Sequence, residues 1–231
     1  MKVILRIALS ATLLGAILLS TGCQTSKGVL SNLDNPFSDP TLNPSNFYVD
    51  AEKIDAVRRV VMMPVHAPNV GLTSEHDIDD QFLSKLTATQ LFEVVFLPRE
   101  DLTRRFGKRS FSSAEPISDS VFQYVKETAN ADAIAFFDIT AYQPFQPIKV
   151  GVRGKLILIP EQEVIWAVDE IFDAHSKSIS KAAMRYEKKH LTRFATSQQN
   201  DTILMSPIRF TGYAAERSIL SLPENSLSRN F

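Results

Sequence analysis

Two neighbouring segments alternate between apolar and polar residues, and they constrain the fold of the chain more than any other feature. In 148–159 the even-numbered residues are Ile, Val, Val, Gly, Leu and Leu, and the odd positions begin Lys, Gly, Arg and Lys. In 164–173 the even positions are Val, Trp, Val, Glu and Phe. A period of two is typical of strands with one buried face. We therefore predict an antiparallel hairpin with one apolar and one polar face, turning near 160–163.

The register of this hairpin is restricted by its faces, which match only when the numbers of paired residues add up to an even value. A sum of 324 would place Leu158 opposite Trp166 and Lys155 opposite Asp169, with Arg153 diagonal to Asp169. Opposite charges across strands stabilise a sheet by ~0.2–1 kcal/mol per pair. We expect this register to be firm, because a slip by one residue would expose Trp166 to water.

The remainder of the chain after residue 57 has the patterns of short strands and amphipathic helices. Apolar runs predict strands at 60–65, 92–97 and 133–140. Helical spacing and capping residues predict helices starting at Ser74, Pro98 and Ser118, and two more near 176–196 and 203–220. The order predicts an α+β domain over 58–221, in which helices pack on a mixed sheet that ends in the antiparallel hairpin and closing helices. A tail would follow at 222–231.

The N-terminus has the pattern of a bacterial secretory signal. Lys2 and Arg6 precede an uncharged, mostly apolar run at 7–19, which is shorter than the ~20 residues that cross a bilayer. Leu-Ser-Thr-Gly-Cys at 19–23 resembles the lipobox of bacterial lipoproteins. The resemblance implies that the signal peptide at 1–22 is removed, that Cys23 is acylated, and that Gln24 favours sorting to the outer membrane. The alternative is a free thiol behind an ordinary signal peptide.

The segment after the cysteine is predicted to be a tether. Residues 24–57 are rich in Ser, Asn, Asp and Pro and keep no helical or strand period for long. We therefore expect a lipidated cysteine and a flexible linker over 23–57. Phe37, Phe47 and Tyr48 are unusual in a spacer, and they either dock on the domain or on a neighbouring subunit, or are simply exposed.

Composition makes several classes of function improbable. The net charge of -1, from 25 basic and 26 acidic residues, is unlike that of proteins that neutralise phosphates, so we expect no nucleic acid as a partner. A single cysteine leaves no intramolecular disulfide. The sequence has no glycine-rich nucleotide motif, no nucleophile elbow and no helical metal spacing among its histidines. We expect no cofactor and no metal. The histidines are His66, His76, His175 and His190.

The order of elements also resembles a family. Arg-Arg-Val-Val-Met-Met-Pro-Val at 58–65 and Ala-Asp-Ala-Ile-Ala-Phe-Phe-Asp-Ile-Thr at 131–140, behind a lipobox and linker, resemble the CsgG-like and LpoB-like outer-membrane lipoproteins. The resemblance covers about 58–175 and implies a non-enzymatic, periplasm-facing domain that forms rings or docks on a partner. Curli-type channels of this superfamily carry additional hairpins that line a membrane barrel. Here only one hairpin is long enough and Glu170 would face lipid, so we expect a core-facing sheet.

Candidate partner-binding residues lie on the polar face of the hairpin. Lys149, Arg153 and Lys155 form a basic stripe. The stripe is either a solvated face or a dock for an acidic partner, an anionic polysaccharide or a neighbouring subunit. The acids that a neighbouring subunit could offer include Asp77, Asp79 and Asp80.

Aromatic residues in the turn before the hairpin form a second candidate surface. Tyr142 and Phe145 flank Pro144 and precede Pro147. Such a tip either anchors an interface or folds onto the sheet.

Three hypotheses about function follow. The leading one is a lipid-anchored scaffold or partner-binding protein on the periplasmic face of the outer membrane, which acts in envelope assembly or export through self-association. It would bind the membrane through its lipid, and a periplasmic or outer-membrane protein or a second copy through its domain. The second is a monomeric, tethered activator of a cell-wall synthase. The third is an envelope hydrolase using Asp138 or Glu170, which fall inside predicted strands. We expect no enzymatic activity.

Overall fold

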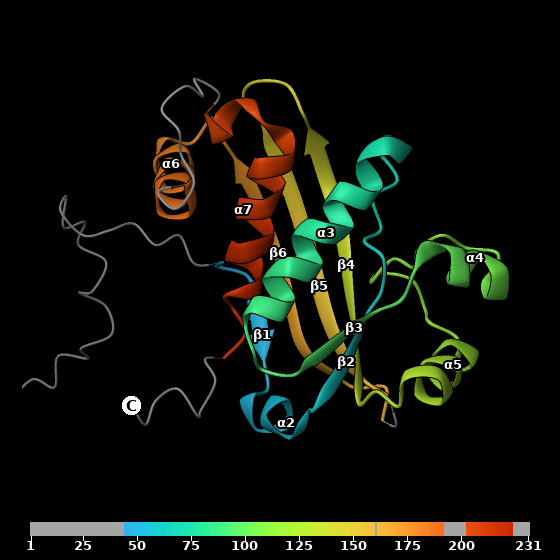
Figure 1. Cartoon of the computed structure of the whole chain (residues 1–231). Coiled ribbons are helices and arrows are strands. Elements are labelled where there is room, and N and C mark those ends of the chain that lie inside the picture. Colours follow the sequence, from blue (N-terminus) through green and yellow to red (C-terminus); the bar gives the residue numbers. More distant parts are fainter. Residues whose placement is uncertain (1–43, 160, 192–201, 224–231) are drawn as a thin grey trace, which may run out of the picture. The chain divides into compact units, whose positions relative to one another are not determined.

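The computed structural model describes residues 44–159, 161–191 and 202–223. These residues form a six-stranded sheet with helices packed on it (Figure 1), which confirms the predicted α+β class. The strands are β1 (Phe47–Val49), β2 (Arg59–Met62), β3 (Glu93–Phe96), β4 (Ala133–Gln143), β5 (Lys149–Leu158) and β6 (Val164–Asp173). The helices are α2 (Ala51–Ala56), α3 (Leu72–Ala88), α4 (Arg99–Phe106), α5 (Asp119–Ala129), α6 (Lys177–Leu191), the 3-10 turn η1 (Ile203–Met205) and α7 (Pro207–Ile219).

The sheet is mixed and has the strand order β1-β6-β5-β4-β2-β3. β2 lies parallel to both β3 and β4, whereas the pairs β4–β5, β5–β6 and β1–β6 are antiparallel. β5 and β6 are the predicted hairpin. The two edges of the sheet are therefore the short strands β1 and β3.

Helices cover the two faces of the sheet unequally. α3 and α7 lie side by side across one face (Figure 1), where Phe82 and Phe210 pack on the even-numbered side chains of β5 and β6. α4 and α5 pack on the opposite face only near β2, β3 and β4, around Leu102 and Phe122. Because side chains alternate along a strand, the neighbours Phe136 and Phe137 of β4 enter these two different cores.

Trp166 organises the larger core. Its indole lies across the β5 backbone at Gly154, where an added Cβ would be 2.6 Å from Trp166 Cη2 and 3.1 Å from Phe137 Cε1. The ring meets Phe137 edge-on, with centroids 6.0 Å apart. The indole Nε1 donates a hydrogen bond of 2.8 Å to Ser221 Oγ, just after α7. One side chain thus connects β4, β5, β6 and the end of α7.

The hairpin register differs from the predicted one by two residues. Arg153 lies directly opposite Asp169, and Leu156, not Leu158, lies opposite Trp166. The physical reason is an earlier turn, in which Leu158 N donates to Glu163 O. A bulge beyond Leu156, where Ile157 pairs with Val164 and one extra residue enters β6, then restores an even sum of paired residue numbers. The apolar and polar faces remain as predicted, because a shift by two residues keeps each side chain on its face.

Two predicted boundaries also differ from the structure. β1 and α2 form within the segment 23–57 that we predicted to be a flexible linker, because β1 pairs with β6 and Ile54 is buried in the core. Asp50 caps α2 by accepting a hydrogen bond from Lys53 N. α3 begins after Gly71 and not at Ser74. The predicted signal peptide, Cys23, Phe37 and the C-terminal tail beyond residue 223 lie outside the described residues.

Replacing Gly154 by alanine is predicted to destabilise the fold, because the new methyl group would overlap the Trp166 ring. Overpacking of this kind lowers the free energy of unfolding by about 1–3 kcal/mol. Urea unfolding followed by the fluorescence of Trp166, the single tryptophan, measures the effect. Gly71→Ala is the matched control, since an added Cβ there meets no atom within 4 Å. An unchanged urea midpoint for Gly154→Ala would show that Trp166 does not require this contact.

Candidate functional site

The predicted basic stripe lies on β5, on the sheet face opposite α3 and α7, and two of its three charges are paired within the chain. Lys149 Nζ lies 2.8 Å from Asp173 Oδ2, and Arg153 Nε and Nη2 lie 2.8 and 2.7 Å from Asp169 Oδ2. Lys155 Nζ donates to the backbone oxygen of Ser113 at 2.7 Å. The predicted pair between Lys155 and Asp169 is therefore absent, because the register moves Arg153 into that place. The acids of β6 thus neutralise Lys149 and Arg153, and Lys155 keeps its charge.

A shallow depression of about 240 Å³ lies beside the stripe, where β1 joins β6 and β5. Its lining includes Tyr48, Arg153, Ala167 and Asp169. The Arg153–Asp169 pair forms a neutral part of its lining, and Lys155, which donates to the Ser113 carbonyl, also lines it.

The acidic surface expected on α3 is also different. Asp79 is 2% exposed and faces the interior, so it cannot meet a neighbouring subunit. Asp80 stays on the surface, with its carboxylate 4.0 Å from His76 Nε2. Of the three acids Asp77, Asp79 and Asp80 that a neighbouring subunit could offer to the basic stripe, Asp79 is therefore wrong.

The two aromatic residues of the predicted tip have different environments. Tyr142 is half-buried against the α3–α7 core, and burial raises the pKa of its hydroxyl above the ordinary value. Phe145 is 79% exposed in the turn between β4 and β5. The turn thus partly folds onto the sheet, while one aromatic ring projects from it.

Asp138 fastens a loop and does not face solvent. Its carboxylate accepts hydrogen bonds from Ser113 N at 3.0 Å, from Ser113 Oγ at 2.6 Å and from Ser112 Oγ at 3.2 Å. The side chain is buried on the same face as Lys155, which holds the backbone of this loop. Asp138 therefore ties the loop before α5 onto β4.

Glu170 binds the start of the described chain. Its Oε2 accepts hydrogen bonds from Ser45 N at 2.8 Å and Ser45 Oγ at 3.0 Å. Glu170 pairs in register with Val152 on the α3–α7 face, whereas Asp138 pairs with Arg153 on the other face. The two carboxylates lie on opposite sides of the sheet, so they cannot act together on one substrate.

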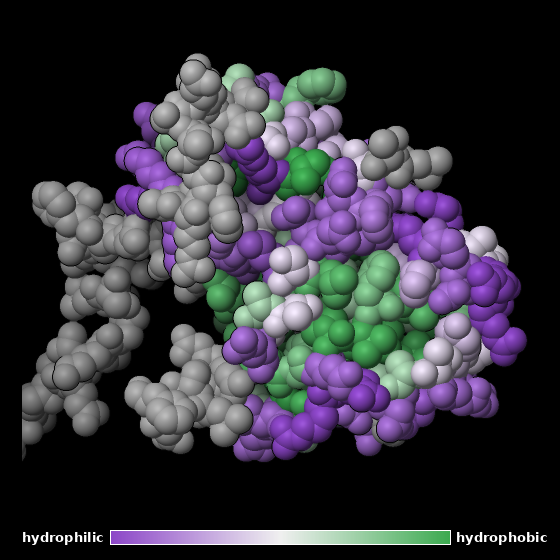
Figure 2. Space-filling model, viewed as in Figure 1, coloured by the Kyte–Doolittle hydropathy of each residue, from purple (hydrophilic) through white to green (hydrophobic). Residues whose placement is uncertain are grey.

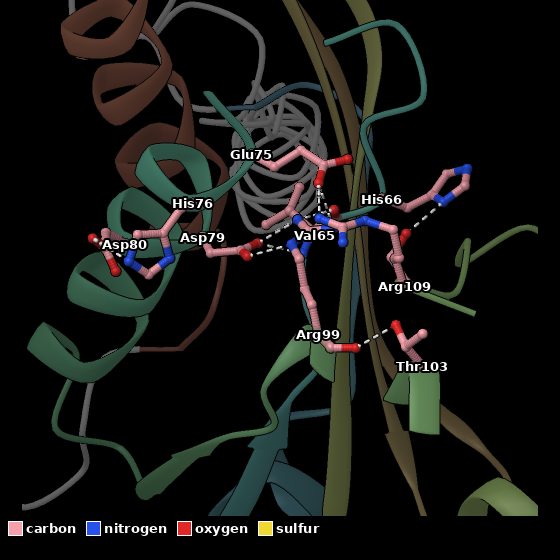
Figure 3. Close-up of polar contacts among 10 residues, drawn as sticks. Val65, His66, Glu75, His76, Asp79, Asp80, Arg99, Thr103 and Arg109 are labelled. Atoms are coloured by element: carbon pink, nitrogen blue, oxygen red, sulfur yellow. Dashed lines mark hydrogen bonds and ion pairs between the residues drawn. The ribbon is translucent and has the colours of Figure 1, made fainter. Parts of the chain in front are cut away.

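A buried ion-pair network connects α3 to α4 (Figure 3). Arg99, at the start of α4, points at Asp79 and donates from Nε and Nη2 at 2.7 and 2.8 Å. The same pair holds Val65 after β2, because Asp79 accepts from Val65 N and Arg99 donates to Val65 O, each at 2.8 Å. Glu75 lies 3.6 Å from Arg99 Nη1 and 2.7 Å from Arg109 Nη2. Burial raises the pKa of the Asp79 carboxyl above its ordinary value, although Arg99 opposes this shift.

Sequence analysis missed this network, although α3 carries a signal for it. Asp79 lies in the apolar stripe of the helix, one residue after Ile78 and three before Phe82. An acid inside such a stripe requires a cation from another element. Arg99 is distant in sequence, so only the fold identifies it as the partner.

An apolar hollow of about 390 Å³ runs along the free edge strand β3. Figure 2 shows hydrophobic residues exposed in a depression where Figure 1 places β3. The hollow is lined by Val61, Val95, Phe96, Leu97, Pro98, Val125, Thr128 and Ala129, with Arg59, Glu93 and Asp101 also part of the lining. Arg59 and Glu93 pair with each other at 2.9 Å, so this part of the lining is neutral.

The backbone along this edge is also free on one side. Glu93 N donates to Arg58 O and Leu97 N to Met62 O, both toward β2. Because these directions alternate along a strand, the amide and carbonyl groups of Val94 and Phe96 face away from the sheet. Among the described strands, none pairs with β3 on that side.

The opposite edge of the sheet presents aromatic side chains. Phe47 and Tyr48 of β1 are 48% and 51% exposed. One edge of the sheet thus has an apolar hollow, and the other has two projecting aromatic rings.

Among the described residues we find neither a metal site nor a helix that could cross a membrane. No cluster of His, Cys, Asp and Glu among them is arranged to hold a metal ion. None of their helices is both long and apolar enough to cross a bilayer. His66 Nδ1 lies 3.1 Å from Ser110 Oγ, and His190 Nε2 lies 3.4 Å from Glu216.

No protein-family model and no curated protein matches the chain. Among solved structures it is similar to a PelC dodecamer from Paraburkholderia phytofirmans, with 14% identity, a TM-score of 0.36 and coverage of 54% of this chain and 78% of that one. It is similar to lipoprotein GNA1162 from Neisseria meningitidis, with 9% identity, a TM-score of 0.38 and coverage of 60% and 99%. It is also similar to E. coli LpoB, with 11% identity, a TM-score of 0.39 and coverage of 61% and 75%. Similarities this low carry no argument about activity or partners.

The ion pair between Asp79 and Arg99 is predicted to be the strongest charge interaction of the described fold. Arg99→Met should lower the free energy of unfolding by about 3–5 kcal/mol, because it leaves Asp79 buried without a cation. Arg104→Met is the matched control on the same helix; its exposed pair with Asp101 should contribute no more than about 1 kcal/mol. Urea unfolding of both single variants and of Arg99→Met with Asp79→Leu measures the coupling. Strict additivity of the two single effects would contradict this assignment.

Proposed function

We propose that the chain is a lipid-anchored, periplasm-facing scaffold of the outer membrane that associates with copies of itself in envelope assembly or export, and that it is not an enzyme. Its lipobox-like sequence at 19–23 supports the anchor. The chemistry of the anchor is acylation of Cys23, and several acyl chains would hold the chain firmly at a membrane.

The single observation that carries the self-association is the complementarity of the two sheet edges. β3 offers free backbone groups beside an apolar hollow, and β1 offers two projecting aromatic rings. Pairing of β1 of one copy with β3 of the next would continue the sheet. Tyr48 projects on the same face as Val95, so its ring would enter the hollow, whereas Phe47 projects on the opposite face. Such a contact is head-to-tail, so it produces a ring when the rotation between copies closes.

The polar groups of the fold support the non-enzymatic part of the proposal. Asp138 and Glu170, the carboxylates considered for catalysis, each hold another segment of the chain, and Asp79 is engaged with Arg99. Asp138 and Glu170 lie on opposite faces of the sheet, so they do not form a pair of carboxylates for acid–base work on one substrate.

Acylation at Cys23 is the first expected outcome. Full-length chain expressed in a Gram-negative host should incorporate labelled palmitate and sediment with the outer membrane. Cys23→Ser should abolish both the label and the membrane sedimentation, because the chain has no other cysteine. Incorporation that persists in Cys23→Ser would rule out this anchor.

Self-association is tested by light scattering over a concentration series, with the chain from residue 23 onward carrying Cys23→Ser. This chain keeps every residue of the described fold. We expect a discrete oligomer that is reduced to monomers by Val95→Lys in the hollow or by Tyr48→Lys on β1, since either change places a charge in the apolar contact. Ile171→Lys on the open face of β6 is the matched control and should leave the oligomer intact.

Mixing the two blocked variants distinguishes head-to-tail pairing from a symmetric contact. A Val95→Lys copy still has β1, and a Tyr48→Lys copy still has β3, so the mixture should form dimers and nothing larger. A chain that remains monomeric at all concentrations would contradict self-association. The tethered activator of a cell-wall synthase would then be the better proposal, with the β3 hollow as its contact surface.

A further inference from the structure

Three separate segments that lie at one end of the domain contain no charged residue. Residues 67–74, 139–148 and 202–208 contain no Asp, Glu, Lys, Arg or His. Figure 1 shows the start of α3, the turn between β4 and β5 and the start of α7 at the same end of the sheet. Ile139 N donates to His66 O at 2.9 Å and Gln146 Nε2 donates to Leu204 O at 3.3 Å, so the segments are in contact.

The opposite end has a different character. α2 contributes Glu52, Lys53 and Asp55 there, and the turn between β5 and β6 contributes Glu161 and Glu163. The three segments, which we call the uncharged end, thus differ from the opposite end of the sheet. Ionisable residues do occur beside them, where Asp173, His175 and Lys177 connect β6 to α6.

Large apolar side chains project from the uncharged end. Phe145 is 79% exposed and Met205 is 56% exposed. Both stand on convex features, a tight turn and a 3-10 turn, and neither lines any of the pockets described above. A convex apolar tip is suited to a surface that deforms around it.

Two glutamines of this tip donate hydrogen bonds to its own carbonyl groups. Gln143 Nε2 lies 2.9 Å from Pro147 O and 3.5 Å from Phe145 O, and Gln146 Nε2 holds Leu204 O. Pro144 and Pro147 have no backbone N–H to satisfy. The tip thus supplies hydrogen bonds to its own carbonyl groups, which is what a segment needs when it leaves water for lipid.

We propose that this uncharged end contacts a lipid bilayer, and that Phe145 and Met205 insert into its interfacial region. This contact goes beyond the proposed function, which concerns contacts between proteins. It rests on the proposed function only in assuming that the domain lies near a membrane. The tip enters without bringing a charge out of water. With no basic residue in the three segments, the contact does not require anionic lipid.

Vesicle flotation tests this contact without the lipid anchor, using the chain from residue 23 onward with Cys23→Ser. The probes are vesicles of phosphatidylcholine alone and vesicles that also contain phosphatidylglycerol, each at low and high salt. We expect equal binding to both kinds of vesicle and no weakening by salt. Phe145→Gln combined with Met205→Gln should reduce binding at least about tenfold, since two apolar side chains leave the lipid.

Ile171→Gln is the matched control, because Ile171 is equally exposed but lies on the open sheet face. It should bind vesicles as the parent chain does. Unchanged thermal unfolding of all variants would show that the exposed positions do not affect the fold. A complementary measurement uses Phe145→Trp in vesicles of brominated phosphatidylcholine, where the new indole should be quenched and the buried Trp166 should not.

Three results would overturn the inference. The first is no flotation of the parent chain with either vesicle, which would leave a protein pocket as the partner of the tip. The second is full binding by the double variant. The third is binding only to anionic vesicles that disappears in salt, which would assign the contact to basic residues elsewhere. Light scattering measures self-association without lipid and does not depend on these three results. A failure of the vesicle experiment would therefore not contradict the proposed self-association.

Discussion

The packing of Trp166 over Gly154 is the contact on which the rest of the domain depends. A side chain at residue 154 would push the indole away from the sheet, and with it the edge contact to Phe137 and the hydrogen bond to Ser221. These contacts join the central strands to the end of α7. α3 packs beside α7 on the same face of the sheet, and its Asp79 fixes the start of α4 through Arg99. The helices on both faces of the sheet therefore depend on the space that Gly154 leaves for Trp166.

Charge in this domain is used mainly to hold the chain together. Arg153 and Lys149 pair across the hairpin, Arg99 pairs under α3, and Asp138 and Glu170 fasten segments that are distant in sequence. The surfaces that remain without internal partners are apolar: the β3 hollow, the β1 aromatics and the uncharged end. This distribution favours contacts with proteins and lipid over chemistry on a small substrate.

The sequence predicted the parts of the fold that depend on local periodicity. The α+β class, the hairpin and the face on which Trp166 lies follow from alternation, which a two-residue shift preserves. The register did not follow, because the bulge after Leu156 depends on how β6 packs and not on its pattern. β1 was not predicted, because three residues are too few to show a period. The strand is stabilised by its pairing with β6 and not by its own sequence pattern.

The candidate surfaces were predicted less well, for a related reason. The basic stripe was visible in the sequence, but the pairing of Arg153 with Asp169 and of Lys149 with Asp173 depends on register, and the hydrogen bond of Lys155 to the Ser113 carbonyl depends on a distant loop. The exposure of Phe145 was left open between two alternatives, and the structure places it outside the core. The β3 hollow needed the strand order, which no single segment contains.

The position of β1 has a mechanical consequence. A chain held at Cys23 would transmit any pull on the domain through Ser45 and the three-residue strand that follows it. A pull along β1 would load the Ser45–Glu170, Asn46–Asp169 and Asp50–Ile165 hydrogen bonds together, in shear. A pull across the sheet would break them one after another and peel β1 from β6. Tension in the second direction would therefore remove the edge that β3 of a neighbouring copy needs, and the tether would act as a release for the assembly.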